Sequence, residues 1–301
     1  MTILITGANG LIGSDLVKKL SNKHKIFGIY RTKNDEVKKI KNVIWIKYNL
    51  KKNFKKKLKP NPKFIIHCAV AQETSKKKSI SDYIDSNVTI LKNIANYAKD
   101  NKVKLIINLS SVEVYGDIKK KLLDENYLPH NQNTYGLTKL LSEQVLYGQK
   151  INFINIRLPG VLCEPFQKKF TRPWLNNVFN KMRKNQNIVV HNIKSKFNNV
   201  INTEEIVKFV KFLIKKDILI RDTFNFVSLK PIILKDILNI AKKKLNSKSK
   251  ITEIKDYKNN SFYISTKKLE QELKYKTQST KNVIEKYLES LYNLEQGNQL
   301  L

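Results

Sequence analysis

Hydrophobic residues in the first half of the chain form short runs that alternate with stretches of helical periodicity. Between the runs, apolar residues recur at helical spacing after Gly13 and over residues 80–99, where Ile80, Ile84 and Leu91 belong to one apolar face, and again over 137–146. Strands that are apolar almost throughout and alternate with helices predict an α/β fold with a doubly wound parallel sheet. The runs themselves predict strands at residues 2–6, 26–30, 43–48, 64–68, 103–109 and 151–158.

Beyond Pro159 the alternation becomes looser, which indicates a second region. We therefore predict a dinucleotide-binding domain over residues 1–158, with returning segments near 197–228, and a smaller, mainly helical substrate lobe over 159–301. The Lys-, Asn- and Ser-rich stretch 246–261 is predicted to be a loop. The predicted elements of the second region are helices near 172–184, 204–216, 231–246 and 280–293, with short strands near 188–190 and 223–226.

The chain has 301 residues and a formal net charge of +33, carried by 58 basic residues. Arginine, which nucleic-acid-binding proteins favour for phosphate and guanine contacts, is scarce, whereas lysine is spread over the predicted solvent-facing positions. We therefore interpret the lysines as a solvated surface. A nucleic-acid site stays an alternative, which a steep salt dependence of binding to duplex would support. No apolar run has the length of a membrane span, and we expect a cytoplasmic protein with reduced cysteines and no metal ligands.

A glycine-rich segment, Thr6-Gly7-Ala8-Asn9-Gly10-Leu11-Ile12-Gly13, joins the first predicted strand to the first helix. Glycines at such a turn let the pyrophosphate of a dinucleotide approach the free N–H groups at the start of the helix. This context predicts a Rossmann-type binding loop, and the alternative is a tight structural turn. The residues expected to contact the cofactor here are Gly7, Asn9, Gly10, Leu11, Ile12 and Gly13.

The residue after the second strand discriminates between the two nicotinamide dinucleotides. An acid at this position binds the ribose hydroxyl of NAD, whereas a basic residue accommodates the additional phosphate of NADP. Arg31 occupies this position and no acid follows until Asp35. The sequence therefore favours NADP(H), with NAD(H) as the alternative.

Tyr135 and Lys139 lie four residues apart at the start of a predicted helix, and so project from one face. A free tyrosine has a pKa near 10 and is a poor base, but a lysine ammonium one turn away stabilises its phenolate. Upstream, an apolar strand ends in the hydroxyls of Ser110 and Ser111, which can hold a substrate alcohol or carbonyl. This combination predicts acid–base catalysis at an alcohol or ketone.

Together these motifs resemble the extended short-chain dehydrogenases/reductases, the family of nucleotide-sugar epimerases, dehydratases and reductases. The resemblance implies that Ser111 binds the reacting oxygen, Tyr135 transfers the proton and Lys139 tunes it, while hydride passes to or from the nicotinamide. It also implies a homodimer formed by helices near 84–100 and 134–149. The further cofactor contacts implied by the resemblance are Asn49, Leu50, Cys68, Ala69, Val70, Asn87, Ser110, Tyr135, Lys139 and Leu158.

Departures from the family pattern narrow the reaction. Val112 stands where dehydratases of the family carry a proton-donating Asp, so dehydration is disfavoured, while Glu113 and Arg172 are candidate substrate contacts. Gly160 replaces an Asn that many epimerases use to bind the substrate diphosphate. With Arg31 pointing to NADP(H), we predict a keto-sugar reductase in the synthesis of surface-polysaccharide precursors. The alternatives are a nucleotide-sugar epimerase with tightly bound NAD and a non-catalytic regulatory protein that binds a dinucleotide.

Overall fold

The computed structural model describes residues 1–52, 61–71, 79–163, 173–255 and 262–298. These residues divide into two compact units, each with its own hydrophobic core. We call the first the sheet unit; it comprises Met1–Asp117, Leu128–Leu158 and Ile206–Phe224. The C-terminal unit comprises Ile118–Tyr127, Pro159–Glu205 and Asn225–Leu301.

The sheet unit is built on a seven-stranded sheet with the order β12-β7-β5-β4-β1-β2-β3. The pairings that join β3, β2, β1, β4, β5 and β7 are all parallel, so their carboxyl ends lie at one edge. This confirms the predicted α/β fold with a doubly wound parallel sheet. The strands are β1 (Thr2–Thr6), β2 (Lys25–Tyr30), β3 (Val43–Lys47), β4 (Phe64–His67), β5 (Leu105–Ser111), β7 (Phe153–Leu158) and β12 (Arg221–Asn225).

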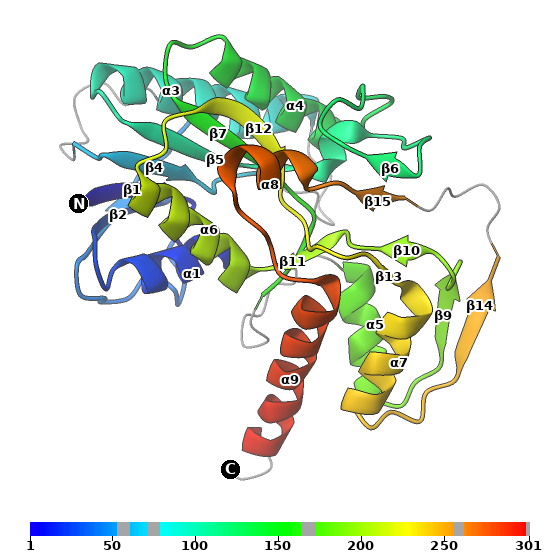
Figure 1. Ribbon diagram of the computed structural model, residues 1–301. Coiled ribbons are helices and arrows are strands. Elements are labelled where there is room, and N and C mark those ends of the chain that lie inside the picture. The colour runs from blue at the N-terminus through cyan, green and yellow to red at the C-terminus, as the bar shows by residue number, and fades with distance from the viewer. Residues whose placement is uncertain (53–60, 72–78, 164–172, 256–261, 299–301) are drawn as a thin grey trace. The chain divides into compact units, whose positions relative to one another are not determined.

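Helices cover both faces of this sheet. In Figure 1, α1 (Leu11–Leu20) and α6 (Thr203–Lys216) lie on one face, and α3 (Ile90–Asp100) and α4 (Thr134–Tyr147) lie on the other. On the second face, Leu4, Ile65 and Ile106 of the strands pack with Leu91 of α3 and Leu146 of α4. Burying such aliphatic side chains is the main source of stability for the unit.

The helix that precedes α3 differs from the predicted pattern. The chain is helical from α2 (Ile80–Tyr83) through a π-helical turn, η1 (Ile84–Thr89), into α3. A π turn contains an extra residue, which rotates the helix faces relative to an unbroken α-helix. The single apolar face predicted over residues 80–99 is therefore wrong at its start: Leu91 is buried, but Ile80 and Ile84 are exposed.

A row of buried polar side chains crosses the sheet near its carboxyl edge. Thr6, His67, Asn108 and Asn155 are paired in register on neighbouring strands. The Nδ2 of Asn108 donates to Oδ1 of Asn155 at 2.8 Å, and Nδ2 of Asn155 donates to Oγ1 of Thr223 at 2.9 Å. At the other end of the row, Oγ1 of Thr6 lies 2.7 Å from Nδ1 of His67. These bonds offset much of the cost of burying the amides and hydroxyls, although Oδ1 of Asn108 is buried without a hydrogen-bond partner among the described residues.

The C-terminal unit contains helices and short two-stranded sheets around a second core. Its core includes Leu175, Phe179, Ile237 and Leu288. Within the predicted loop 246–261, residues 251–254 instead form a strand parallel to β9, so the loop prediction is wrong there. The helices are α5 (Pro173–Arg183), α7 (Leu234–Lys244), α8 (Lys267–Leu273) and α9 (Thr280–Asn298). The strands are β6 (Leu122–Leu123), β8 (Gly160–Leu162), β9 (Ile188–His191), β10 (Lys196–Phe197), β11 (Val200–Asn202), β13 (Ile232–Ile233), β14 (Ile251–Ile254) and β15 (Tyr263–Ile264).

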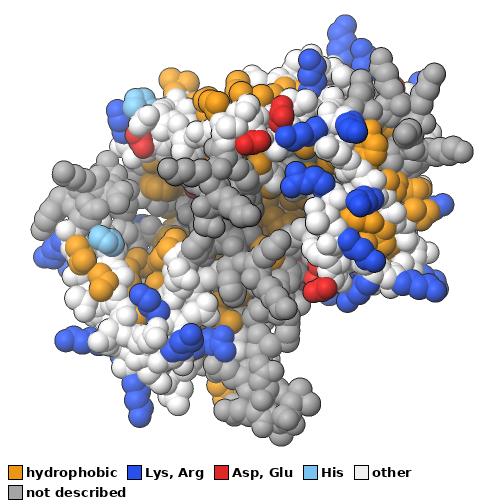
Figure 2. All heavy atoms as spheres, turned by 180° about the vertical axis from the view of Figure 1, so that it is seen from behind, with side chains coloured by type: hydrophobic (Ala, Val, Ile, Leu, Met, Phe, Trp, Pro, Cys, Tyr) orange, Lys and Arg blue, Asp and Glu red, His pale blue; other side chains and the backbone are white. Residues whose placement is uncertain are grey.

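The excess positive charge is spread over the surface that Figure 2 shows. There, Lys and Arg side chains are scattered among apolar and uncharged groups instead of forming one continuous patch. Within the described parts of the chain, every helix is too short or too polar to cross a membrane.

Candidate active site

The glycine loop between β1 and α1 has a shape that requires glycine. Gly7 has φ +62°, and a Cβ on it would lie 2.7 Å from the backbone N of Ala69. A Cβ on Gly13 would collide with the carbonyl oxygen of Gly7. Gly10, Leu11 and Ile12 lead into α1, whose first N–H groups have no partner within an α-helix. The loop therefore forms a close, side-chain-free approach to a helix N-terminus, the kind of position that binds phosphate groups.

Asn9 joins this loop to the segment that follows β2. Its Nδ2 donates to the Thr32 carbonyl at 2.7 Å and to Oδ1 of Asn34 at 3.1 Å, while Nδ2 of Asn34 donates back to the Asn9 carbonyl at 2.9 Å. Arg31, at the end of β2, is exposed beside this reciprocal contact. The structure thus brings Arg31 to the same edge of the sheet as the glycine loop.

The ends of β3 and β4 lie at the same edge. Asn49 is exposed and Leu50 is buried after β3, while Cys68, Ala69 and Val70 are half-buried after β4. Of these residues, Cys68 and Ala69 border the glycine loop, since a Cβ on Gly7 would lie within 3 Å of their backbone.

Asn87 lies in the π-helical turn and is buried. Its Oδ1 accepts from the backbone N of Ala71 at 3.0 Å, and its Nδ2 donates to Oγ1 of Thr138 at 3.0 Å. Asn87 therefore links the segment after β4 to α4, the helix that carries Tyr135 and Lys139.

Ser111 ends β5, and its Oγ accepts from the backbone N of Glu113 at 3.2 Å. The chain then makes a 3₁₀ turn, η2 (Val112–Tyr115). Gly136, the neighbour of Tyr135, packs so closely on η2 that a Cβ there would collide with the Glu113 carbonyl. The first turn of α4, which holds Tyr135, is thereby pressed against the end of β5, which holds Ser111.

Lys139 is buried, with 2% of its surface exposed. Its Nζ donates to the carbonyl of Leu109 at 2.8 Å, which fixes the ammonium against β5. Burial lowers the pKa of Lys139 to about 8, against the opposing effects of Glu143 and Cys68. A lysine with this pKa changes charge close to neutral pH, which suits a group that tunes an acid–base residue.

Two further ionisable groups lie near Lys139 at the end of β4. Burial, with a smaller effect of the Lys139 charge, lowers the pKa of His67 to about 3, so its imidazole is neutral. Burial raises the pKa of the Cys68 thiol, so the thiol is protonated and is a poor nucleophile.

A buried acid, Glu143, lies next to this site and was not predicted from the sequence. Glu143 lies one turn after Lys139, is fully buried, and accepts from Oγ of Ser110 at 2.5 Å and from Nη2 of Arg157 at 2.7 Å. A signal for this pair exists in the sequence: a charged residue on the sheet-facing side of α4, and an arginine within an otherwise apolar strand.

The remaining sequence candidates are only partly placed by the structure. Leu158 ends β7 and is buried. Glu113 is half-buried in η2. Arg172 lies outside the described residues.

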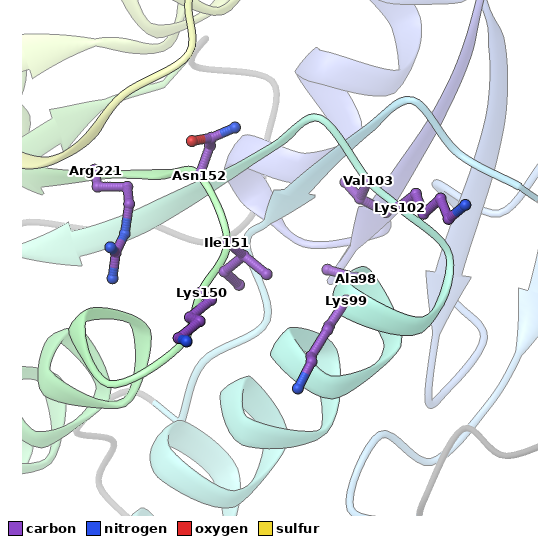
Figure 3. A pocket seen from close by; sticks show the side chains of 8 residues that line it. All are labelled: Ala98, Lys99, Lys102, Val103, Lys150, Ile151, Asn152 and Arg221. Atoms are coloured by element: carbon purple, nitrogen blue, oxygen red, sulfur yellow. The ribbon is translucent and has the colours of Figure 1, made fainter.

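A pocket of about 360 Å³ lies elsewhere on the sheet unit, beside the amino ends of β5 and β7 (Figure 3). Its cations include Lys99, Lys150 and Arg221, and Nη2 of Arg221 donates to the carbonyls of Tyr147 at 3.0 Å and Gln149 at 2.7 Å. These cations lie at the C-terminal ends of α3 and α4, where positive charge stabilises a helix. The pocket is at the opposite edge from the glycine loop and holds none of the candidate catalytic residues.

Comparison with known proteins identifies similar sequences. A family model described as "NAD dependent epimerase/dehydratase family" matches residues 3–225. The chain is 26% identical over 147 residues to GDP-6-deoxy-D-talose 4-dehydrogenase of Aggregatibacter actinomycetemcomitans, covering 48% of this chain and 47% of that protein. It is 28% identical over 126 residues to dTDP-4-dehydro-6-deoxy-D-allose reductase of a Streptomyces species, covering 38% of this chain and 39% of that protein. The matches thus span about half or less of each relative.

The fold is also shared with solved structures. UDP-glucuronic acid 4-epimerase from Bacillus cereus, in complex with NAD, superposes with a TM-score of 0.78 and 20% sequence identity. The superposition covers 97% of this chain and all of that chain. At this level of identity the likeness concerns the fold.

Proposed function

Because the chain belongs to the NAD-dependent epimerase/dehydratase family, we propose that it is an oxidoreductase acting on a hydroxyl or keto group of an activated sugar. The observation that carries this proposal is the arrangement at one edge of the sheet unit. There the glycine loop, the end of β5 with Ser111, and α4 with the buried Lys139 lie together. The glycine loop would hold a dinucleotide, the end of β5 would hold a substrate oxygen, and α4 would supply the acid–base group.

The residues present fit a nicotinamide dinucleotide. A Cβ on Gly7 or Gly13 would collide with neighbouring backbone, so the tight turn before α1 depends on both glycines. The helix N-terminus that follows this turn favours a pyrophosphate. Arg31, Asn49 and Leu50 would lie along the adenosine half. When bound, the dinucleotide supplies the hydride acceptor or donor.

The chain's own residues would manage the proton. The Tyr135 hydroxyl would give a proton to, or take one from, the substrate oxygen, and the Ser111 hydroxyl would hold that oxygen by a hydrogen bond. The Lys139 ammonium, fixed on the Leu109 carbonyl, would stabilise the Tyr135 phenolate from one helical turn away. We assign the sugar-binding contacts to the C-terminal unit.

The exposed Arg31 at the end of β2 favours NADP(H), and with it a keto-sugar reductase. One of the similar proteins, dTDP-4-dehydro-6-deoxy-D-allose reductase, is named as an enzyme of this reaction class. Arg31→Ala should weaken NADPH binding about tenfold or more, since a hydrogen bond to a charged group contributes about 1.5–3 kcal/mol, and should leave NADH binding unchanged. Nicotinamide fluorescence titration would measure both affinities.

A charge-matched control is Lys41→Ala, which removes an exposed cation before β3, at the opposite edge of the sheet. It should leave both affinities unchanged. If the wild type binds NADH as tightly as NADPH, the preference for a reductase loses its support.

The epimerase is the second candidate, and an NAD-bound 4-epimerase is among the structures that share the fold. Incubating the protein with a panel of nucleotide-activated sugars and keto-sugars, with and without NADPH, separates the two. A reductase consumes NADPH in proportion to product, whereas an epimerase converts a sugar without added dinucleotide and releases tightly bound NAD on denaturation.

We also propose that two copies of the chain associate through the helices that cover one face of the sheet unit. Ile84 in η1 is 39% exposed, and Leu137 and Leu141 in α4 are 37% and 43% exposed. Several large apolar side chains on neighbouring helices are typical of a surface that another protein covers.

A further inference from the structure

Beneath the proposed catalytic residues lies a buried group of charges that the mechanism above does not use. The carboxylate of Glu143 accepts two hydrogen bonds from Arg157, from Nε at 3.1 Å and from Nη2 at 2.7 Å. The guanidinium also lies 4.7 Å from the ring centre of Tyr115, in the turn that follows Ser111. Such a two-point contact between planar groups fixes the orientation of both side chains.

Glu143 also connects the two elements that carry the catalytic side chains. It stands on α4 one turn after Lys139, and it accepts a 2.5 Å hydrogen bond from Oγ of Ser110, the residue before Ser111 on β5. Meanwhile Nζ of Lys139 is bound to the carbonyl of Leu109, the residue before Ser110. The helix and the strand are thus joined at two adjacent strand positions. Lys139 donates a hydrogen bond to the strand at Leu109, and Glu143 accepts one from the strand at Ser110.

We propose that Glu143 is a positioning residue for the reaction: oriented by Arg157, its carboxylate holds the Ser110–Ser111 strand end against α4 and keeps Lys139 positively charged. The inference rests on the proposed roles of Ser111, Tyr135 and Lys139. Glu143 itself touches neither substrate nor cofactor in this arrangement, and it acts through Lys139 and the strand.

The electrostatic part of this role follows from the surroundings of Lys139. From β4, the ionisable groups that face the ammonium are His67 and Cys68, both uncharged, as burial lowers the pKa of the first to about 3 and raises that of the second. From its own helix, Glu143 supplies negative charge that opposes the effect of burial on the pKa of Lys139. Beyond Glu143, Arg157 on β7 carries a positive charge; burial acts to lower its pKa, but the bonds to Glu143 outweigh that effect and raise it.

With Glu143 present, Lys139 loses its charge as the pH rises through about 8. Removal of the carboxylate charge takes away the larger of the two effects that oppose burial, so the lysine loses its charge at a lower pH. As the pH rises, any step that needs the charged lysine, including the cofactor contact that the family resemblance implies for Lys139, is therefore lost at a lower pH than in the wild type.

The test compares Glu143→Gln with the wild type across pH 6–9, following NADPH binding by fluorescence and turnover of the keto-sugar that the wild type accepts. The upper limb of both profiles should move to lower pH by about one unit, which gives a roughly fivefold loss at pH 8, a loss approaching tenfold at pH 9, and a much smaller loss at pH 6. Glu143→Asp, which keeps the charge, should recover most of the upper limb. Glu289→Gln, which removes the acid of the exposed ion pair with Lys244, should leave the profiles unchanged.

Because Glu143→Gln leaves Arg157 buried without its partner, the variant can lose stability. The double variant Glu143→Gln/Arg157→Met removes both charges, and its melting temperature should be closer to that of the wild type. The upper limb of its pH profiles should still move to lower pH, but by less than in Glu143→Gln. An equal loss of activity at every pH in both variants would overturn the inference and leave Glu143 with a purely structural role. Tyr135→Phe tests the proposed function separately. If that variant turns over substrate as fast as the wild type, the proposed function itself fails, whatever the result for Glu143.

Discussion

Lys139 shows how the environment of a single residue governs the proposed chemistry. Removed from water, an ammonium group is costly, and the protein offsets that cost with a carbonyl acceptor on β5 and a carboxylate one turn away. Its pKa of about 8 keeps it mainly charged at neutral pH but close to the point of change. Lys139 can therefore respond to small changes in its neighbours, as a residue that tunes Tyr135 must.

His67 should make the stability of the protein depend on pH. Its pKa is about 3 in the folded protein and near 6.5 when unfolded, so the unfolded chain binds a proton that the folded protein does not. The stabilisation is fully present above pH 6.5 and is lost as the pH falls towards 3, by up to about 1.4 kcal/mol per unit. We expect His67→Gln to reduce the loss of stability between pH 7 and pH 5, measured by urea denaturation at each pH.

The matched control is His130→Gln, at an exposed position of the same unit. It should keep the pH dependence of the wild type. An unchanged slope in His67→Gln would show that another group carries the acid sensitivity.

At the scale of elements, the sequence predicted the parallel sheet and the glycine loop because their signals are local. Apolar runs give strands, and Gly7 and Gly13 stand where the backbone approaches another backbone too closely for a side chain. Asn87 illustrates what could not be predicted. It lies in a π-helical turn, and its side-chain amide makes hydrogen bonds to Ala71 and Thr138, which are far away in the sequence. No helical periodicity encodes such partners.

The pairing of Glu143 with Arg157 was missed for a related reason. A sequence shows that a charged residue falls on a buried face but not which opposite charge it will meet from another element. Likewise, residues 251–254 form a strand because β9 is available to pair with them, although the surrounding composition is that of a loop. Both features depend on tertiary contacts and not on local propensity.

Asn87→Ala should destabilise the sheet unit by about 1–3 kcal/mol, because it leaves the buried N–H of Ala71 without its acceptor. Thermal or urea denaturation measures the change. Asn96→Ala, an exposed asparagine on α3 of the same continuous helix, is the matched control and should cost nothing measurable. Equal effects of the two substitutions would remove the role assigned to the Asn87 bridge.

At the scale of the whole molecule, the proposed association of two copies must overcome the repulsion between two chains of charge +33. Apolar burial through Ile84, Leu137 and Leu141 would supply the attraction, and salt would screen the repulsion. Dimerisation should therefore strengthen as the ionic strength rises.

Leu141→Glu should convert the dimer to a monomer, because burying an unpaired carboxylate at the contact is unfavourable. Size-exclusion chromatography with light scattering would report twice the mass of one chain for the wild type and the mass of one chain for the variant. Leu128→Glu, at a leucine that is 84% exposed, should keep the dimer. A wild type that is monomeric at every salt concentration would refute the proposed association.

The polar row that crosses the sheet also constrains how the strands can assemble. In a strand, neighbouring side chains point to opposite faces, so a shift of one residue would turn Asn108 or Asn155 away from the row and leave its partner's amide buried and unpaired. An apolar strand alone tolerates such slips more readily, since one isoleucine packs much like the next. The row therefore specifies the register of the strands. It adds little net stability but makes each misaligned pairing unfavourable, so that the carboxyl ends of the strands lie level with one another.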